Sequence, residues 1–404
     1  MRQTQARRRT PLLLVFMMLA LLSSALAGQY RILHAFGTGE DGAGVWGSLA
    51  IDEHGNLYGT TEGGGGTCCG IAFQLTPQPD GRWTENILYD FNCKVGGCQP
   101  FAGLVADPAG NLYGMANTDV FELTPGQSGW TISVLNDQQG GTESLLLDQA
   151  GNLYASLGAG EYNQGAISEL VKDQNWTENW LYSFCSENSR QRRCMDGTDA
   201  LSALTWGPDG ALYGTTKHGG NPQYNSPNCG IIGCGVVYQL SPQADGTWKE
   251  NVLHSFPAFE SDGYTLFDSV ILDKSGNVYG ATAQGGTKNC GSIFKLTHEV
   301  TGWKETILHE CGSNNLIFDA NGNLWGTTPG GGKYGYGTVF ELSPQKSGKW
   351  KYTVVHQFNG ADGASPNAAV TFDEQGNLYG TTVLGGPGNS VGVVFEITTT
   401  PSPQ

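Results

Sequence analysis

Short apolar segments rich in β-branched and aromatic residues recur along the chain in one fixed order. An apolar piece ending in aspartate, such as Leu49 to Asp52, precedes a piece such as Asn56 to Gly59. A piece like Val339 to Leu342 and another like Trp303 to His309 complete the order. Each is four to seven residues long and is typical of a β-strand, so the repeating unit is predicted to be a four-stranded antiparallel sheet.

The second piece of each unit carries a five-residue signature that occurs seven times: GNLYG at 55, 110 and 376, GNLYA at 151, GALYG at 210, GNVYG at 276 and GNLWG at 322. Seven units of four strands predict an all-β, seven-bladed β-propeller. The segment from Tyr30 to Phe36 matches the fourth piece of a unit, and Val393 to Ile397 matches a third piece. The N-terminal strand is therefore expected to complete the last blade, in one domain covering residues 30–397.

In six copies the first two strands are joined by Asp-x-x-Gly-Asn, as in Asp52 to Asn56 and Asp273 to Asn277. Aspartate caps a type I turn and glycine takes the left-handed position that closes it, which is hairpin chemistry. A calcium loop is the alternative. Since each copy supplies one acidic residue and the turn recurs in most blades, the sequence favours the turn.

Composition agrees with short strands and turns. Glycine accounts for 61 of 404 residues, while charged residues make up only 14%. Long amphipathic helices need a charged face, so an all-α fold is excluded. The formal net charge of −16 and the thin spread of basic residues exclude nucleic acid as a partner.

Residues 1–27 have the layout of a signal peptide: a basic start, an apolar run from Pro11 to Leu22, and Ala25-Leu26-Ala27 ahead of Gly28. The apolar run is too short for a membrane span, and no other segment could form one. The mature chain is expected to be secreted or held in the periplasm or cell envelope. Residues 398–404 form a short tail without a hydrophobic sorting segment.

Ten cysteines suit an exported chain, and their spacing favours disulfides over a metal site. The expected pairs are Cys185–Cys194, Cys229–Cys234 and Cys290–Cys311. The pairing of Cys68, Cys69, Cys93 and Cys98 stays open. Cys69 occupies the position of Cys290 and could reach Cys93, or Cys93 could close on Cys98.

The run GNLYGTT-x-x-GG followed by G-x-VF-x-L resembles the GloVer tandem repeat of exported bacterial "choice-of-anchor" proteins, over essentially the whole mature chain. A double glycine after the second strand and a tryptophan before the fourth are also similar to the Kelch layout. The resemblance implies a propeller and export, without an activity. Because the chain ends at Gln404 without an anchor segment, release is expected.

Loops of variable length join the second to the third strand and the fourth strand to the next blade. They share one face of a propeller, which is the expected binding face. Four of these loops carry Asp-Gly at Asp41, Asp196, Asp262 and Asp362. These carboxylates could converge at the channel mouth on a cation or polar ligand, although a plain turn is favoured. Aromatic residues of the same loops that could stack on sugar rings include Trp46, Tyr224, Tyr264 and Tyr336.

The sequence therefore favours a monomeric binding or interaction module for an extracellular glycan or protein. Alternatives are a lyase or glycan hydrolase that uses two acidic residues of the variable loops, or a structural envelope protein. The sequence has no HExxH, GxSxG or P-loop motif, so no catalytic residue and no cofactor are expected, and a bound cation has no support. Histidines such as His34 and His254 share one position in the outermost strand and are interpreted as packing residues.

Overall fold

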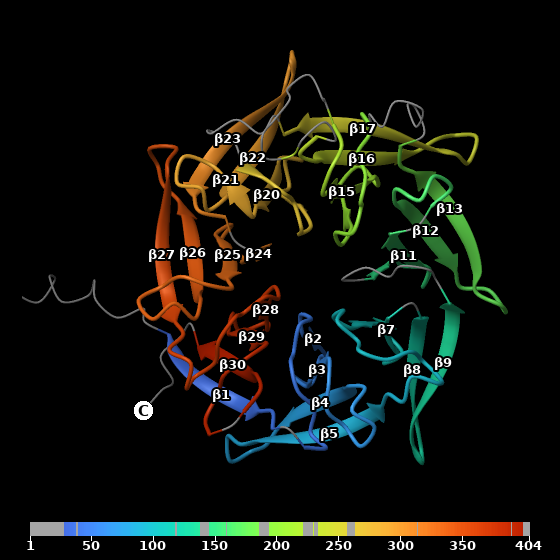
Figure 1. Ribbon diagram of the computed structural model, residues 1–404, viewed down its shortest axis with the longest axis vertical. Coiled ribbons are helices and arrows are strands. Elements are labelled where there is room, and N and C mark those ends of the chain that lie inside the picture. Colours follow the sequence, from blue (N-terminus) through green and yellow to red (C-terminus); the bar gives the residue numbers. More distant parts are fainter. Residues whose placement is uncertain are drawn as a thin grey trace, which may run out of the picture.

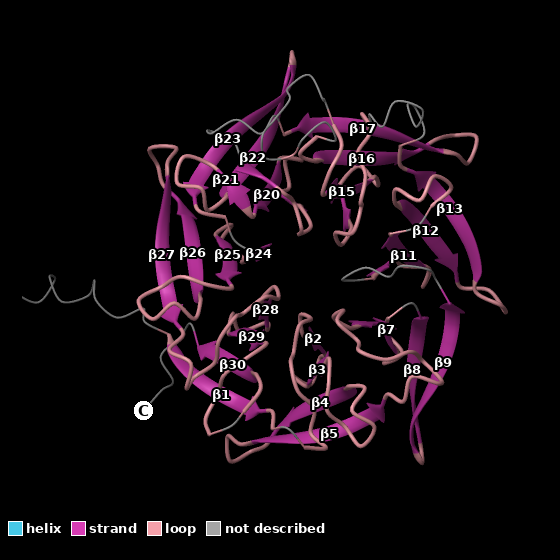
Figure 2. Cartoon of the chain, viewed as in Figure 1, coloured by secondary structure: helices cyan, strands magenta, loops and turns pink. Residues whose placement is uncertain are grey.

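The computed structural model describes residues 28–37, 39–117, 119–137, 145–158, 160–185, 194–220, 229, 233–256, 263–312, 314–388 and 390–398. Within these ranges all regular structure is β-strand. The strands form seven four-stranded antiparallel sheets arranged in a ring (Figures 1 and 2). The predicted seven-bladed β-propeller is confirmed.

The four strands of each blade follow one another from the axis of the ring to its outer wall. Blade 1 contains β2 (Ala50–Ile51), β3 (Leu57–Thr60), β4 (Ile71–Pro77) and β5 (Trp83–Asp90); blade 2 contains β6 (Val105–Ala106), β7 (Leu112–Ala116), β8 (Asp119–Gly126) and β9 (Gly129–Asp137). Blade 3 contains β10 (Leu146–Leu147), β11 (Leu153–Leu157), β12 (Ala166–Val171) and β13 (Thr177–Ser183); blade 4 contains β14 (Thr205–Trp206), β15 (Leu212–Thr216), β16 (Val236–Pro242) and β17 (Trp248–Ser255). Blade 5 contains β19 (Ile271–Leu272), β20 (Val278–Thr282), β22 (Ser292–Glu299) and β23 (Gly302–Glu310); blade 6 contains β24 (Asn314–Phe318), β25 (Leu324–Thr328), β26 (Thr338–Pro344) and β27 (Trp350–Gln357). Blade 7 contains β28 (Thr371–Phe372), β29 (Leu378–Thr382), β30 (Val393–Thr398) and β1 (Gln29–Ala35), and a small separate sheet pairs β18 (Gly263–Tyr264) with β21 (Gln284–Gly285).

The two ends of the described chain meet in blade 7. Strand β1 pairs antiparallel with β30, and Tyr30 lies opposite Ile397. Figure 1 shows the blue N-terminal strand beside the red C-terminal one. This pairing closes the ring and covers an edge that would otherwise be exposed, as expected from the sequence.

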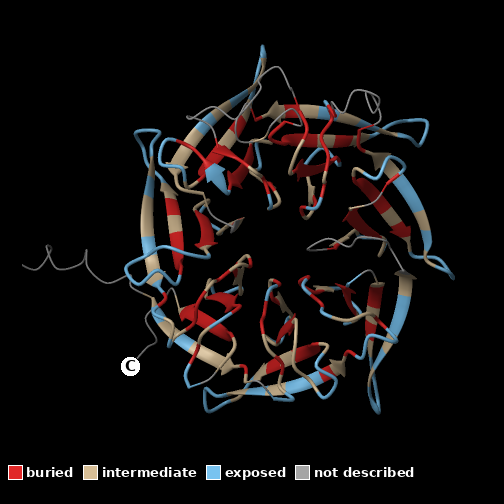
Figure 3. Cartoon of the chain, viewed as in Figure 1, coloured by how far each residue is buried: buried red, intermediate tan, exposed pale blue. Residues whose placement is uncertain are grey.

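The hydrophobic core lies between adjacent blades, because the second and third strands are buried and the fourth faces solvent (Figure 3). The last residue of the signature is glycine in six blades, and it lies opposite an aromatic residue of the third strand. The pairs are Gly59–Phe73, Gly114–Phe121, Gly214–Tyr238, Gly280–Phe294, Gly326–Phe340 and Gly380–Phe395. A Cβ atom at Gly59 would lie 2.6 Å from the Phe73 ring. In blade 3 the pair is Ala155 with Ser168 instead. The glycine therefore makes room for an aromatic ring, and alanine is accepted where that ring is absent.

The Asp-x-x-Gly-Asn turns are held by their aspartates. In blade 5, Asp273 Oδ1 accepts from the backbone N–H of Ser275 at 2.9 Å and of Asn277 at 3.0 Å. Its Oδ2 accepts from the side-chain amide of Asn277 at 2.7 Å and from the Tyr279 hydroxyl at 3.0 Å. Burial alone would raise the pKa of Asp273, but these hydrogen bonds hold the pKa below its ordinary value. With so many protein donors on each carboxylate, the geometry supports the turn interpretation.

Blade 4 lacks the aspartate of this turn, and a carboxylate two residues later takes its place. Gly207 stands where the other blades have aspartate. Asp209 replaces the lost carboxylate, since its Oδ2 accepts from the Tyr213 hydroxyl at 3.0 Å. A carboxylate thus fixes the second-strand aromatic residue in this blade too.

The outermost strands of neighbouring blades meet in seams that contain the histidines of the repeat. His309 stacks on Tyr352 with ring centroids 3.9 Å apart, and in other seams a histidine lies close to a glutamate of the next blade. His34 Nε2 lies 3.7 Å from Glu85 Oε1 across the seam between blades 7 and 1. Burial, with Asp41 adding to it, raises the pKa of Glu85 to about 7, and burial lowers the pKa of His34. The histidines therefore serve packing between blades, away from the axis.

Candidate functional site

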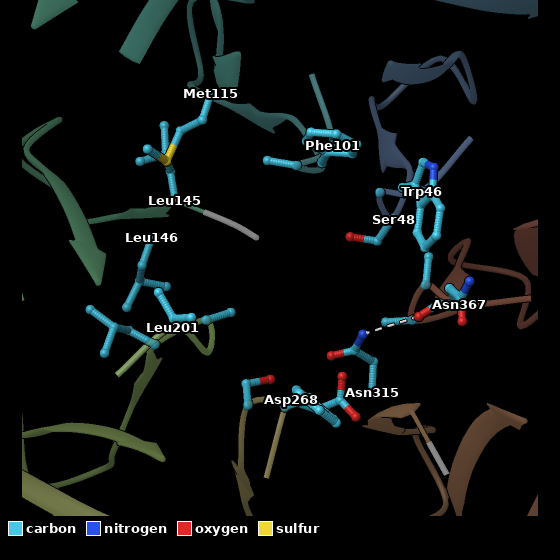
Figure 4. Close-up of a pocket in the computed structure, with 18 of the residues that line it drawn as sticks. Trp46, Ser48, Phe101, Met115, Leu145, Leu146, Leu201, Asp268, Asn315 and Asn367 are labelled. Atoms are coloured by element: carbon cyan, nitrogen blue, oxygen red, sulfur yellow. Dashed lines mark hydrogen bonds between the residues drawn. The ribbon is translucent and has the colours of Figure 1, made fainter. Parts of the chain in front are cut away.

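A cavity of about 720 Å³ opens on the axis of the ring, at the face formed by the variable loops (Figure 4). We call it the axial cavity. Every blade contributes to its lining, mostly through the segment just before its innermost strand: 46–48, 101–102, 145–146, 201, 203–204, 267–269, 315 and 367–369. A concave site that draws on all seven repeats is the expected position for a ligand on this scaffold.

Large apolar side chains surround the mouth of the axial cavity. They are Trp46, Phe101, Leu201 and Phe267, and between 38% and 45% of each is exposed. All four occupy the same place in their repeats, six residues before the aspartate of the turn or, in blade 4, before Gly207. Asn367 takes that place in blade 7. Exposed apolar groups gathered at one concave site make the axial cavity the candidate functional site.

Polar groups complete the lining. Asn315 and Asn367 face each other, with Asn315 Nδ2 donating to the Asn367 carbonyl at 3.4 Å (Figure 4). Ser48, Ser269 and Asn117 add further polar groups, and Asp268 is the single carboxylate of the described lining, which contains no lysine or arginine. The axial cavity thus offers apolar ring faces together with amide and hydroxyl groups, and little charge.

Asp41, Asp196 and Asp362 are not among the described lining residues of this cavity, and each accepts hydrogen bonds within its own loop. Asp196 Oδ2 accepts from the Tyr182 hydroxyl at 2.9 Å and from the Cys185 N–H at 2.8 Å. Asp362 Oδ1 accepts from the Asn359 N–H at 2.8 Å, and Asp41 Oδ2 from the Gly37 N–H at 3.0 Å.

Each of these carboxylates accepts a hydrogen bond from a residue at the end of the outermost strand or within two residues of it. This explains why the three aspartates lie at the outer wall. Asp262 falls outside the described residues.

The aromatic candidates separate in the same way. Trp46 lines the axial cavity, and its Nε1–H donates to Glu62 Oε2 at 2.6 Å. Tyr264 is buried in a hydrophobic cluster with Phe256, so it packs the core. Tyr336 is exposed but does not contribute to the cavity lining, and Tyr224 lies outside the described residues.

Sequence reasoning missed Leu201, Phe267, Asn315 and Asp268. A signal for them was present, since counting back from the repeated turn aligns Phe267 with Trp46. The composition of the loops does not reveal this alignment, because the loops that precede these positions differ in length.

Disulfides brace the loops of the same face. The structure contains the three bonds Cys185–Cys194, Cys229–Cys234 and Cys290–Cys311. The other four cysteines are thiols, and Cys69 Sγ lies 2.7 Å from Cys93 Sγ. Cross-links at these positions restrict the long loops around the axial cavity.

A second cavity, of about 680 Å³, lies between blades 6 and 7 beside the Asp319 and Asp373 turns. These two aspartates are already bound by the turn, for example through Asn323 Nδ2 to Asp319 Oδ2 at 2.8 Å. Over the described ranges, no group of three or more His, Cys, Asp or Glu side chains is placed to hold a metal ion. That part of the chain also has no helix suited to crossing a membrane.

The repeat was compared with known protein families. Residues 226–403 match the family model described as the Gloeobacter/Verrucomicrobia repeat, in agreement with the GloVer resemblance. No curated protein matches the sequence.

Similar solved structures share the fold at low identity. Virginiamycin B lyase from Staphylococcus aureus has a TM-score of 0.55 at 12% identity, covering 92% of this chain and 99% of that one. Puromycin hydrolase has a TM-score of 0.56 at 13% identity, covering 90% of this chain and 53% of that one. The extracellular domain of a hybrid two-component system from B. thetaiotaomicron has a TM-score of 0.57 at 11% identity, covering 91% and 39%. At these identities the likeness concerns the fold alone.

Proposed function

We propose that this chain, a β-propeller carrying the Gloeobacter/Verrucomicrobia repeat, binds a neutral oligosaccharide in its axial cavity. The observation that carries the proposal is the mouth of that cavity, where Trp46, Phe101 and Phe267 expose aromatic surface. Sugar rings present apolar C–H faces that pack on aromatic rings, and their hydroxyls pair with amides such as Asn315 and Asn367.

Charge favours a neutral glycan over an acidic one. The whole chain has a formal net charge of −16, and the described lining of the axial cavity includes Asp268 but no basic residue. An anionic ligand would be repelled at a distance by this negative charge. Beside the lining, Lys217 Nζ lies 5.0 Å from the Phe267 ring centroid, so a cation is present at one side of the mouth. A neutral oligosaccharide does not meet the repulsion.

We place this binding outside the cytoplasm, in a chain that is exported through residues 1–27 and acts as a monomer. Three disulfides in the described residues support an oxidising compartment. The ring closes on itself through β1 and β30, so its sheet edges need no second subunit.

Binding is favoured over catalysis, although a lyase and a hydrolase are among the similar structures. Glycan hydrolysis ordinarily uses two carboxyl groups about 5 to 9.5 Å apart. The described lining contains one carboxylate, Asp268, while Asp41, Asp196 and Asp362 accept hydrogen bonds within their own loops.

Calorimetric titration with neutral hexasaccharides (cellohexaose, mannohexaose, xylohexaose and chitohexaose) tests this function. At least one should bind, and Trp46→Ala should weaken its affinity by about tenfold, since stacking of this kind contributes roughly 1 to 2 kcal/mol. Trp180→Ala is the matched control, because Trp180 is an exposed tryptophan on β13, away from the cavity. Equal losses in the two variants, or no binding of any hexasaccharide, would contradict the proposal.

A further inference from the structure

Three cysteine sulfurs gather where the loop that follows β5, with Cys93 and Cys98, meets the loop before β4, with Cys69. Cys93 is exposed, and its Sγ lies 2.7 Å from Cys69 Sγ. Cys98 also interacts with Cys93: hydrogen bonds between the Cys93 thiol and the sulfurs of Cys69 and Cys98 raise the pKa of Cys93 to about 12. One sulfur thus has two cysteine neighbours that compete for it.

The backbone holds this arrangement in place. The Cys93 N–H donates to the Gly97 carbonyl at 3.2 Å, which folds the loop back on itself. The Gln99 N–H donates to the Cys69 carbonyl at 2.8 Å and ties the end of the loop to the start of β4. Cys93 and Gln99 both have positive φ, at 57° and 54°, so the loop accepts local strain to keep this shape.

Blade 5 provides the contrast within the same molecule. Cys290 occupies the position of Cys69, two residues before the third strand, and is bonded to Cys311 at the end of the fourth strand. No third cysteine accompanies that pair in the described part of blade 5. The same structural position therefore has a single partner in one blade and a cluster in the other.

We propose that Cys93 is the shared sulfur of an exchangeable disulfide, which bonds alternately to Cys69 and to Cys98. In the first state the loop is tied to β4; in the second it is tied only to itself. The cluster is thus a redox site on the variable-loop face, and its partner is a small disulfide or a dithiol–disulfide oxidoreductase.

The chemistry balances in two steps. Oxidation removes two electrons and two protons from Cys69 and Cys93, forms their S–S bond, and reduces one external disulfide to two thiols. Exchange then has the Cys98 thiolate attack Sγ of Cys93: the Cys93–Cys98 bond forms, the Cys69–Cys93 bond breaks, and Cys69 leaves as the thiolate. Exchange has no net redox change, so it needs no further oxidant.

The central position of Cys93 fits this order. Cys69 and Cys98 both interact with the Cys93 sulfur. They can therefore alternate as attacking and leaving groups, while Cys93 is the sulfur that is attacked.

The test is disulfide mapping of the full chain after equilibration in glutathione redox buffers. Acid quenching and alkylation trap the pairs, and trypsin cleavage at Arg82 and Lys94 separates the three cysteines into different peptides. Wild type should contain both the Cys69–Cys93 and the Cys93–Cys98 linkages. C98S should contain only the first, C69S only the second, and C93S neither, while C68S should keep both.

The Cys290–Cys311 bond is the internal control and should be unchanged in every variant, which also reports that each variant has folded. Failure of C69S to form Cys93–Cys98 would overturn the proposal. A wild type in which every molecule pairs Cys69 with Cys93 and Cys68 with Cys98 would overturn it as well, because two fixed disulfides leave no thiol to exchange.

Discussion

The two faces of this propeller are built from the same repeat and behave in opposite ways. On the hairpin face, formed by the turns that join first to second and third to fourth strands, the Asp-centred turn recurs in six blades, and Asp209 restores its contact in blade 4. On the variable-loop face the loops differ in length, carry the disulfides and surround the axial cavity. Uniform turns fix each blade, and this leaves the opposite loops free to differ.

This difference indicates that the residues that stabilise the fold and the residues proposed to bind a ligand lie on opposite faces. The turn aspartates on the hairpin face, such as Asp273, accept several hydrogen bonds from their own turn, so they stabilise the fold. Trp46 and Phe267 on the other face are exposed by about two-fifths, so they contribute little to stability and are available. Mutations at the two faces should therefore have different readouts.

The largest effect is expected from Asp273→Ala on the hairpin face. The change removes an acceptor of four hydrogen bonds and leaves the Asn277 and Tyr279 donors without it. Unfolding free energy should fall by about 2 to 4 kcal/mol, measured by urea denaturation. Oligosaccharide affinity at temperatures where the variant is folded should be unchanged.

Asp245→Ala is the matched control, because Asp245 caps an exposed turn between β16 and β17 with a bond to the Thr247 N–H at 3.0 Å. Its effect on unfolding should be clearly smaller. An equal loss in both variants would mean that the repeated turn contributes no more than any surface turn.

The next largest effect is expected from the double variant F101A/F267A on the variable-loop face. Affinity for the bound hexasaccharide should fall by roughly 10- to 100-fold, because two stacking surfaces are lost. The unfolding transition should shift little, since 45% of Phe101 and 42% of Phe267 are exposed. A large stability loss with unchanged affinity would reverse the assignment of the two faces.

A smaller effect is expected from pH, which changes the charge of Glu85 and His34 in a seam between outermost strands. A change of pH should alter the unfolding free energy without altering oligosaccharide affinity. The pKa of Glu85 is raised from 4.5 to about 7 in the fold. Its contribution to stability is therefore complete below pH 4.5 and is lost as the pH rises through 7. The pKa of His34 is lowered, so its contribution is lost in the other direction, as the pH falls below its ordinary value of 6.5.

Unfolding free energy should accordingly fall by on the order of 1 kcal/mol between pH 6 and pH 8.5, as measured by urea denaturation across this range. In Glu85→Gln this decline should disappear while the loss at acidic pH remains. A decline of the same size in the variant would assign it to another group.

The smallest effect is expected from Tyr58→Phe on the hairpin face. The Tyr58 hydroxyl donates to Asp52 Oδ2 and accepts from Gln74 Nε2, both at 3.0 Å. Loss of these bonds with the ring retained should lower the unfolding free energy by about 1 kcal/mol. Thermal unfolding of Tyr58→Phe beside Asp52→Ala would show whether the hydroxyl contributes less than the carboxylate, as the hydrogen-bond counts require.

Much of the fold could be predicted from the sequence because the signal is repeated. The GNLYG signature, the Asp-x-x-Gly-Asn turn and the match of Tyr30 to a fourth strand predicted the ring and its closure, and local cysteine spacing predicted the disulfides. The residues of the axial cavity were harder to predict. The register of Phe267 and Leu201 depends on where each loop meets the axis, and the carboxylates of Asp41 and Asp362 were bound locally at the outer wall. A loop residue is placed by such contacts, which composition does not record.

The most direct test of the account is hydrogen–deuterium exchange of the full chain with and without the hexasaccharide that binds it most tightly. Ligand should slow exchange in segments 46–48, 101–102 and 267–269, which line the axial cavity. Exchange in the turns 52–56 and 273–277 of the hairpin face should not change. Protection confined to the hairpin face, or binding without protection around the cavity, would contradict the assignment of the axial cavity as the binding site.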